Sequence, residues 1–147
     1  MLQFVCKAFA DLTPYELYAV MQLRLAVFSV EQNCAYQDAD GKDLKAQHLM
    51  GYYDNELAAY SRLLPQGVSY TESSIGRVIT PAKYRRYGYG KLLMEESIRH
   101  MEELYGKGPI KIGAQAYLKK FYEGFGFIDL NEPYLEDGIP HLIMLRP

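Results

Sequence analysis

The strongest chemical signal in the sequence is the run Arg-Arg-Tyr-Gly-Tyr-Gly-Lys at 85–91, a pair of glycines set among basic and aromatic residues. It follows an apolar stretch that stops at a proline, and a long amphipathic segment starts there. At a helix start the backbone N–H groups lack partners and favour an anion, and glycine lets the backbone approach a ligand closely. The run therefore predicts a site for a phosphate or pyrophosphate. Its candidate residues are Arg85, Arg86, Tyr87, Gly88, Tyr89, Gly90 and Lys91.

Two familiar phosphate-binding loops do not fit this run. A Walker A loop needs a glycine where Arg85 stands and a hydroxyl-bearing residue where Leu92 stands. The dinucleotide fingerprint needs a third glycine at the position of Leu93. The remaining pattern is R-x-x-G-x-G between a strand and a helix, which an ordinary strand-to-helix turn would also produce.

The pattern and its setting resemble the GNAT superfamily of acyl-coenzyme A-dependent N-acetyltransferases. A second block with the family's order and spacing lies at 110–127, where a strand and a helix lead to Tyr-x-x-x-Gly-Phe. The segments 26–34 and 136–141 resemble the ElaA-like branch of that superfamily. The resemblance thus covers nearly the whole chain.

The resemblance implies that acetyl-coenzyme A binds at 78–91, with the glycine run around its pyrophosphate and the preceding strand along its pantetheine arm. It also implies an oxyanion donor in the backbone N–H of Val78 or Ile79. Gln115 takes a position that is often asparagine in relatives and contacts the pantetheine. Tyr122, four residues before Gly126, is expected beside the sulfur.

Acetyl transfer from a thioester to an amine explains why a phenol is wanted there. The amine must lose its proton before it attacks, which costs about 4–5 kcal/mol at pH 7 for a pKa of ~10.4. The departing thiolate needs a proton, and a phenol of pKa ~10 can supply it. A packing role is the alternative for Tyr122, because Leu118 and Phe125 share its helix face.

The residue that removes the proton from the amine is less well defined by the sequence. Family members often use a glutamate on the central strands, for which Glu72 is the nearest candidate, while His48 and His141 have suitable side chains. A histidine at a strand start is more often a structural hydrogen-bonding partner. Glu31 and Gln32 end the first helix beside a loop that borders the acceptor cleft in this fold.

These residues must be positioned by alternating strands and helices. The 147 residues predict one domain, 1–147. Thr13-Pro14-Tyr15-Glu16 is a capping box that starts the first helix. The fold expected is α/β, the acyl-CoA N-acyltransferase fold with a mixed central sheet of six to seven strands flanked by helices. Strands are expected at 3–9, 48–53, 57–64, 74–80, 110–114, 126–131 and 140–146. One helix is expected to begin at residue 14, and two more at 91–105 and 116–124. The strands at 74–80 and 110–114 should be parallel to each other.

The composition of the chain limits which classes of partner it is expected to bind. A net charge of −2 gives no general attraction to nucleic acid or anionic membrane, and no apolar run approaches the ~20 residues that cross a bilayer. Cys6 and Cys34 form no metal motif and suit free thiols in a cytoplasmic protein. Asp38 begins an acidic turn, but Leu49 stands where a calcium loop has glutamate, so no metal is expected.

We therefore predict an N-acetyltransferase that moves acetyl from acetyl-CoA to a primary amine by direct attack in a ternary complex. The alternative is a non-catalytic module that binds acyl-CoA. Polyamines, amino acids, antibiotics, peptide N-termini and lysine side chains all remain compatible acceptors. An exposed strand edge also leaves a homodimer possible.

Overall fold

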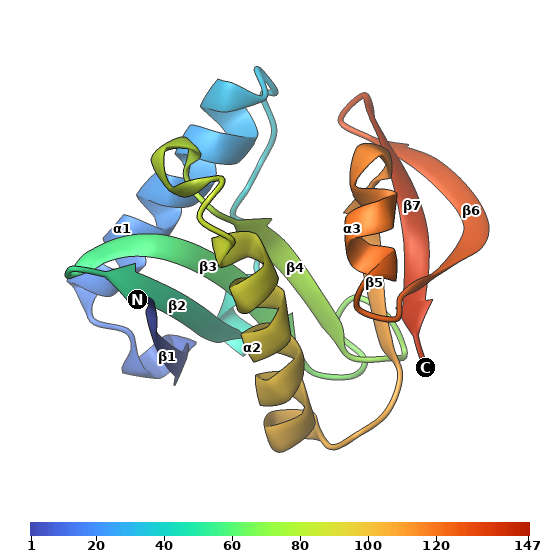
Figure 1. The fold of residues 1–147 in the computed structure, drawn as a ribbon, viewed down its shortest axis with the longest axis horizontal. Coiled ribbons are helices and arrows are strands. Elements are labelled where there is room, and N and C mark those ends of the chain that lie inside the picture. The colour runs from blue at the N-terminus through green and yellow to red at the C-terminus, as the bar shows by residue number, and fades with distance from the viewer.

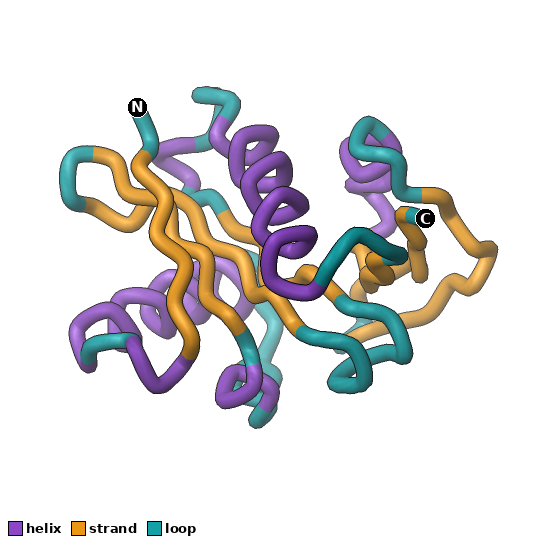
Figure 2. Tube along the Cα trace, turned by 90° about the horizontal axis from the view of Figure 1, so that it is seen from below, coloured by secondary structure: helices purple, strands orange, loops and turns teal.

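The computed structural model describes residues 1–147. It contains two antiparallel sheets that lie side by side, with β4 of the first next to β5 of the second (Figure 1). The first sheet has the order β1-β2-β3-β4, and the second has the order β5-β7-β6. Helices α1 and α2 cover opposite faces of the first sheet (Figure 2). The strands are β1 (Gln3–Ala8), β2 (Gln47–Tyr53), β3 (Glu56–Leu64), β4 (Ser74–Ile79), β5 (Ile110–Gln115), β6 (Ile128–Glu136) and β7 (Ile139–Arg146), and the helices are α1 (Pro14–Arg24), α2 (Tyr89–Tyr105) and α3 (Lys119–Glu123).

The sheets are joined at one point. Ser73 and Ile110 form a parallel bridge, and the Lys111 N–H donates to the Ser73 carbonyl oxygen at 2.9 Å. Beyond it β4 and β5 diverge (Figure 1). The seven strands match the number and order expected, but the expectation of one mixed sheet with a full parallel pair is corrected to two sheets with a single parallel contact.

A bulge in β4 accompanies this divergence. Tyr60 pairs with Ile79 and Arg62 pairs with Gly76, so Arg77 and Val78 together lie opposite one residue of β3. Arg77 has a φ of 49°, in the left-handed region that non-glycine residues rarely adopt. A bulge bends its strand, increases the local twist and leaves one residue unpaired. The bulge therefore turns β4 away from β5 and frees backbone groups at the divergence.

Helix α1 begins as its sequence predicts and ends differently. The Glu16 N–H donates to Thr13 Oγ1 at 3.0 Å, and the Thr13 N–H donates to Glu16 Oε1 at 2.9 Å, so the capping box is confirmed. After Arg24 the chain widens into a π-helical segment, Leu25–Glu31. Such segments are rare and often lie at functional sites.

One apolar core holds the two sheets together beneath helix α2. Met94, Ile98 and Met101 of α2 are buried against it, which agrees with the amphipathic helix expected at 91–105. The same cluster includes Leu63 from the first sheet and Met144 from the second. Side-chain packing, rather than a continuous strand ladder, thus fixes the position of one sheet against the other. None of the helices has both the length and the apolar character needed to cross a membrane.

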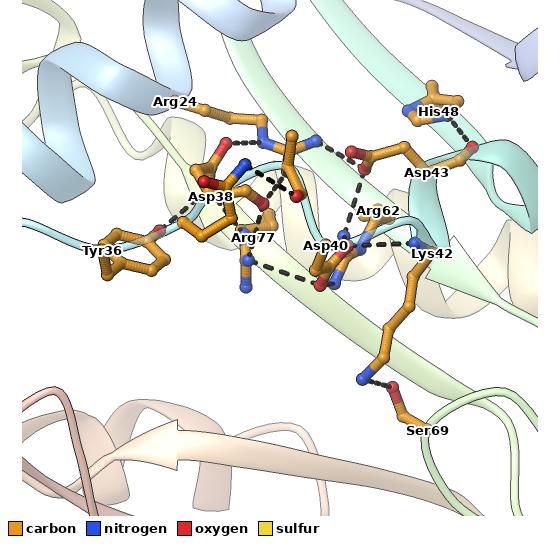
Figure 3. Close-up of polar contacts among 12 residues, drawn as sticks. Arg24, Tyr36, Asp38, Asp40, Lys42, Asp43, His48, Arg62, Ser69 and Arg77 are labelled. Atoms are coloured by element: carbon orange, nitrogen blue, oxygen red, sulfur yellow. Dashed lines mark hydrogen bonds and ion pairs between the residues drawn. The ribbon is translucent and has the colours of Figure 1, made fainter.

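The chain between α1 and β2 is held down by buried ion pairs (Figure 3). Arg24, with no exposed surface, donates from Nε to Asp38 Oδ2 at 2.8 Å and from Nη1 to Asp43 Oδ1 at 2.6 Å. Burial alone would raise the pKa of Asp43, but hydrogen bonds from Arg24 and Arg62 hold it below its usual value. The carboxylates of this acidic turn therefore serve as partners for arginines.

The same network reaches the bulge in β4. Arg77 donates from Nε to the second oxygen of Asp38 at 2.9 Å. Arg62, on β3, donates to both oxygens of Asp40, at 2.8 and 3.0 Å. Because these arginines come from α1, β3 and β4, the network ties the loop to three elements that surround the strand divergence (Figure 3).

Candidate functional site

The divergence of β4 and β5 opens a cleft of about 500 Å³. Both strands line it, and further walls come from the π-helical segment, from α3 and from the turn between β6 and β7. Of the residues expected at the site, nine line this cleft. They are Glu31, Gln32, Val78, Ile79, Arg85, Gly90, Gln115, Tyr122 and His141.

The glycine run forms one end of the cleft at the start of helix α2. Gly88 caps this helix with a φ of 77°, and no side chain accepts a hydrogen bond from the first turn. The backbone N–H groups of Tyr89, Gly90 and Lys91 occupy that turn, where a helix has no internal acceptors. Arg86 and Lys91 are exposed beside them. This geometry suits an anion, with the cleft leading away from it.

Arg85 is held differently from its neighbours in the loop. Its Nη1 and Nη2 atoms donate to the two Glu31 carboxylate oxygens at 3.0 and 2.7 Å, and its Nε donates to the Thr80 carbonyl oxygen at 3.0 Å. The side chains of the pair are each about two-fifths exposed. The sequence predicted Arg85 as a cation of the anion site and Glu31 as an acceptor-side residue, and the structure joins them.

Tyr122 lies on α3 with its ring in the core and also lines the cleft. The ring packs edge-on against Phe121, at 5.2 Å between centroids, and against Phe127, at 6.0 Å. Burial, with a smaller contribution from Tyr117, raises the pKa of Tyr122 to about 12. The phenol therefore keeps its proton at neutral pH. The packing role and the site role that the sequence left open are compatible.

Gln115 and Gln32 meet across the cleft. Gln115 Nε2 donates to Gln32 Oε1 at 3.2 Å, and the reverse contact from Gln32 Nε2 measures 3.4 Å. These two residues were expected to have separate roles, Gln115 toward the cofactor and Gln32 toward the acceptor. Their contact links β5 to the end of the π-helical segment, two parts of the chain 83 positions apart.

His141 offers a basic nitrogen at the opposite wall. Its Nδ1 lies 2.7 Å from the Ile139 carbonyl oxygen, which can only accept, so Nδ1 carries a hydrogen. Its Nε2 lies 3.3 Å from Glu136 Oε2. In the neutral ring Nε2 thus has a free lone pair, and in the charged ring Glu136 balances its proton. The ring is thus held at both nitrogens, by a backbone carbonyl on one side and a carboxylate on the other.

Two residues expected near the acceptor lie elsewhere, and those expectations are corrected. His48 is buried, with Nδ1 at 2.7 Å from Tyr60 Oη and Nε2 at 3.0 Å from the Asp43 carbonyl oxygen. Burial also lowers its pKa. Glu72 precedes β4 and lies 3.5 Å from Lys111 Nζ near the bridge between the sheets. Neither side chain lines the cleft.

The cleft wall also has an aromatic and basic part that was not predicted from the sequence. Phe28, Tyr36 and Arg77 line it together, and the Arg77 guanidinium lies 5.6 Å from the Tyr36 ring centroid and 6.0 Å from that of Phe28. Phe28 belongs to the π-helical segment that follows α1. Tyr36 and Arg77 carry no local signal, because Asp38 positions both: Arg77 by an ion pair and Tyr36 by a hydrogen bond of 2.8 Å.

Comparison with known proteins gives consistent results. A family model described as an acetyltransferase (GNAT) domain matches residues 17–146. Protein ElaA of Escherichia coli is 44% identical over 139 residues, covering 93% of this chain and 91% of ElaA. An acyl-CoA N-acyltransferase from Pseudomonas aeruginosa matches the whole of both chains with a TM-score of 0.95 and 44% identity. The crystal structure of Escherichia coli ElaA does so with a TM-score of 0.93 and 41% identity.

Proposed function

Because this chain belongs to the GNAT acetyltransferase family and is an acyl-CoA-dependent N-acyltransferase, we propose that it transfers acetyl from acetyl-CoA to a primary amine by direct attack within a ternary complex. The observation that carries the proposal is the cleft between β4 and β5. An anion-binding helix start lies at one end of it, and a protonated phenol lies on its wall. Both substrates of the reaction thus have a place in one cavity.

The acyl donor fits the residues of the β4 side. The free N–H groups at the start of α2, with Arg86 and Lys91 beside them, would hold the pyrophosphate. The pantetheine arm would lie along β4 in the gap that β5 leaves. An N–H group freed by the bulge, at Val78 or Ile79, would donate to the oxyanion that forms when the amine attacks the thioester.

Proton transfers complete the reaction. The amine must be neutral to attack, and His141 Nε2 is our candidate to take its proton, with Glu136 balancing the charge on the ring. As the C–S bond breaks, Tyr122 donates its proton to the departing sulfur. His141 thereby holds the proton that the amine nitrogen loses as the C–N bond forms, so these steps leave an amide, free coenzyme A, an imidazolium and a phenolate. Transfer of one proton from the imidazolium to the phenolate through solvent restores both side chains.

The proposal is tested by incubating the protein with acetyl-CoA and a panel of primary amines while free thiol release is followed. We expect thiol release that depends on the amine, with the acetylated amine identified by mass spectrometry. Cofactor binding without thiol release for any amine would instead favour the non-catalytic acyl-CoA-binding module.

Replacing Arg86 and Lys91 by alanine should weaken coenzyme A binding about fivefold per side chain, since a partly exposed ion pair contributes about 1 kcal/mol. Pantetheine, which lacks the phosphates, is the control ligand. It should bind the wild-type protein and the alanine variant equally. Lys107→Ala, at an exposed position just beyond the C-terminal end of α2, is the control variant. Calorimetry measures both affinities, and an equal loss for the two ligands would contradict phosphate binding by this loop.

The rate of turnover should rise with pH. It should not fall near pH ~10, where a free tyrosine would lose its proton. The rate rises with pH because the amine must lose its proton. Tyr122 is the donor and its pKa is raised to about 12, so it stays protonated where a free tyrosine would ionise. Initial rates from neutral pH to about pH 11 test this. A falling limb centred near pH ~10 that is absent in Tyr122→Phe would support Tyr122 as the donor but contradict its raised pKa.

A further inference from the structure

A second hollow, of about 440 Å³, opens beside the cleft on the face of the second sheet. Glu136 lines both cavities, so the hollow adjoins the cleft. Glu132 and Tyr134 precede Glu136 by four and two positions on β6, and alternate residues of a strand point to the same face. All three side chains line the hollow, which we call the β6 groove.

Two tyrosines define where the β6 groove meets the cleft. The hydroxyl groups of Tyr70 and Tyr134 converge over Gly113, where a Cβ would collide with Tyr134 and lie 3.2 Å from Tyr70 Oη. Gly113 itself lines the cleft. The Tyr134 ring also packs against His141, at 5.3 Å between centroids. Tyr134 thus lies between the groove and the histidine that we assign as proton acceptor.

The charges of the groove favour a cation. Lys42, the one basic residue lining it, donates from Nζ to Ser69 Oγ at 2.8 Å. Glu132 is exposed to solvent, and Glu136 has His141 as its partner. Two carboxylates and two tyrosine side chains therefore surround a space into which one lysine, already hydrogen bonded, also points.

We propose that the β6 groove binds a second ammonium group of the acceptor, which makes the acceptor an aliphatic diamine or polyamine. The inference rests on the proposed function, since the first amine must react in the cleft. Glu132 and Glu136 are four strand residues apart, roughly 13 Å along β6. A flexible chain of several methylenes can place one amine near His141 and the other near Glu132.

Three acceptors with the same six-carbon chain test the proposal. Hexylamine ends in a methyl group, hexamethylenediamine in a second ammonium and aminocaproic acid in a carboxylate. We expect kcat/KM for the diamine to exceed that for hexylamine by about fivefold or more, the effect of ~1 kcal/mol, with aminocaproic acid poorest. Glu132→Gln should reduce the ratio of diamine to hexylamine toward one. Glu95→Gln, an exposed carboxylate on α2, should retain it.

Other outcomes of these experiments would overturn the inference. Equal kcat/KM for hexylamine and the diamine would overturn the inference and leave acetyl transfer intact. A preference for aminocaproic acid that Lys42→Gln removes would assign the groove to a carboxylate instead. Calorimetry of hexamethylenediamine with the protein–coenzyme A complex gives a reading that needs no turnover. Binding that Glu132→Gln weakens supports the groove, and absence of binding rejects it, whereas lack of thiol release with every amine rejects the proposed function.

Discussion

Tyr122→Phe should lower kcat by a factor of about 10²–10⁴, the usual contribution of a positioned proton donor. The substitution removes only the hydroxyl group, so the ring should keep its contacts with Phe121 and Phe127. Affinity for acetyl-CoA should therefore change little. Steady-state rates and calorimetry with coenzyme A separate the two effects, because a loss confined to kcat places the hydroxyl in the chemical step.

Tyr105→Phe is the matched control for this experiment. Burial also raises the pKa of Tyr105 to about 12, but its hydroxyl lies on α2 near the Leu63 carbonyl oxygen and not in the cleft. Its removal should leave kcat unchanged. If Tyr122→Phe keeps the full rate as well, another group protonates the sulfur and our assignment is wrong.

Arg24→Met should destabilise the fold by about 3–5 kcal/mol. The change leaves Asp38 and Asp43 in the protein without their shared partner, and Asp38 is almost fully buried. Asp38 then keeps only Arg77 as an ion-pair partner. Asp43 keeps only Arg62, and water cannot replace the lost partner of carboxylates that are so deeply buried. Urea denaturation followed by circular dichroism measures the loss as a lower transition midpoint at an unchanged slope.

Arg99→Met is the comparison for this variant. Arg99 also pairs with two carboxylates, those of Glu96 and Glu103, but its side chain is half exposed on α2. Exposed pairs contribute about 0–1 kcal/mol, so its removal should shift the midpoint only slightly. Equal losses for the two arginine variants would show that the network in Figure 3 is not a main support of the loop.

Local patterns were enough to predict much of the fold. The capping box at Thr13 and Glu16 is visible within four residues, and the stripe of Met94, Ile98 and Met101 within two helical turns. The glycine run is equally local, because the turn before α2 depends on Gly88 adopting a positive φ. These features could be predicted because the residues that create them are neighbours in the chain.

Contacts between distant residues were not accessible in the same way. The split into two sheets depends on a bulge that shows only in the register of β3 against β4. His48 has a side chain suited to catalysis, but Tyr60 and the Asp43 carbonyl oxygen occupy both its nitrogens. The Arg85–Glu31 pair joins positions 54 apart. Residue type indicated which chemistry each side chain could perform, whereas its contacts with distant residues depend on the fold.

The single parallel bridge between Ser73 and Ile110 has a mechanical consequence. Because no strand ladder fixes the distance between the two sheets, the width of the cleft between β4 and β5 depends on the apolar packing beneath it. Met144 is completely buried in that packing, and Ile112 is nearly so. Shortening either side chain, both of which lie in the second sheet, should change the width of the cleft and thereby change turnover without altering a residue that we assign to the chemistry.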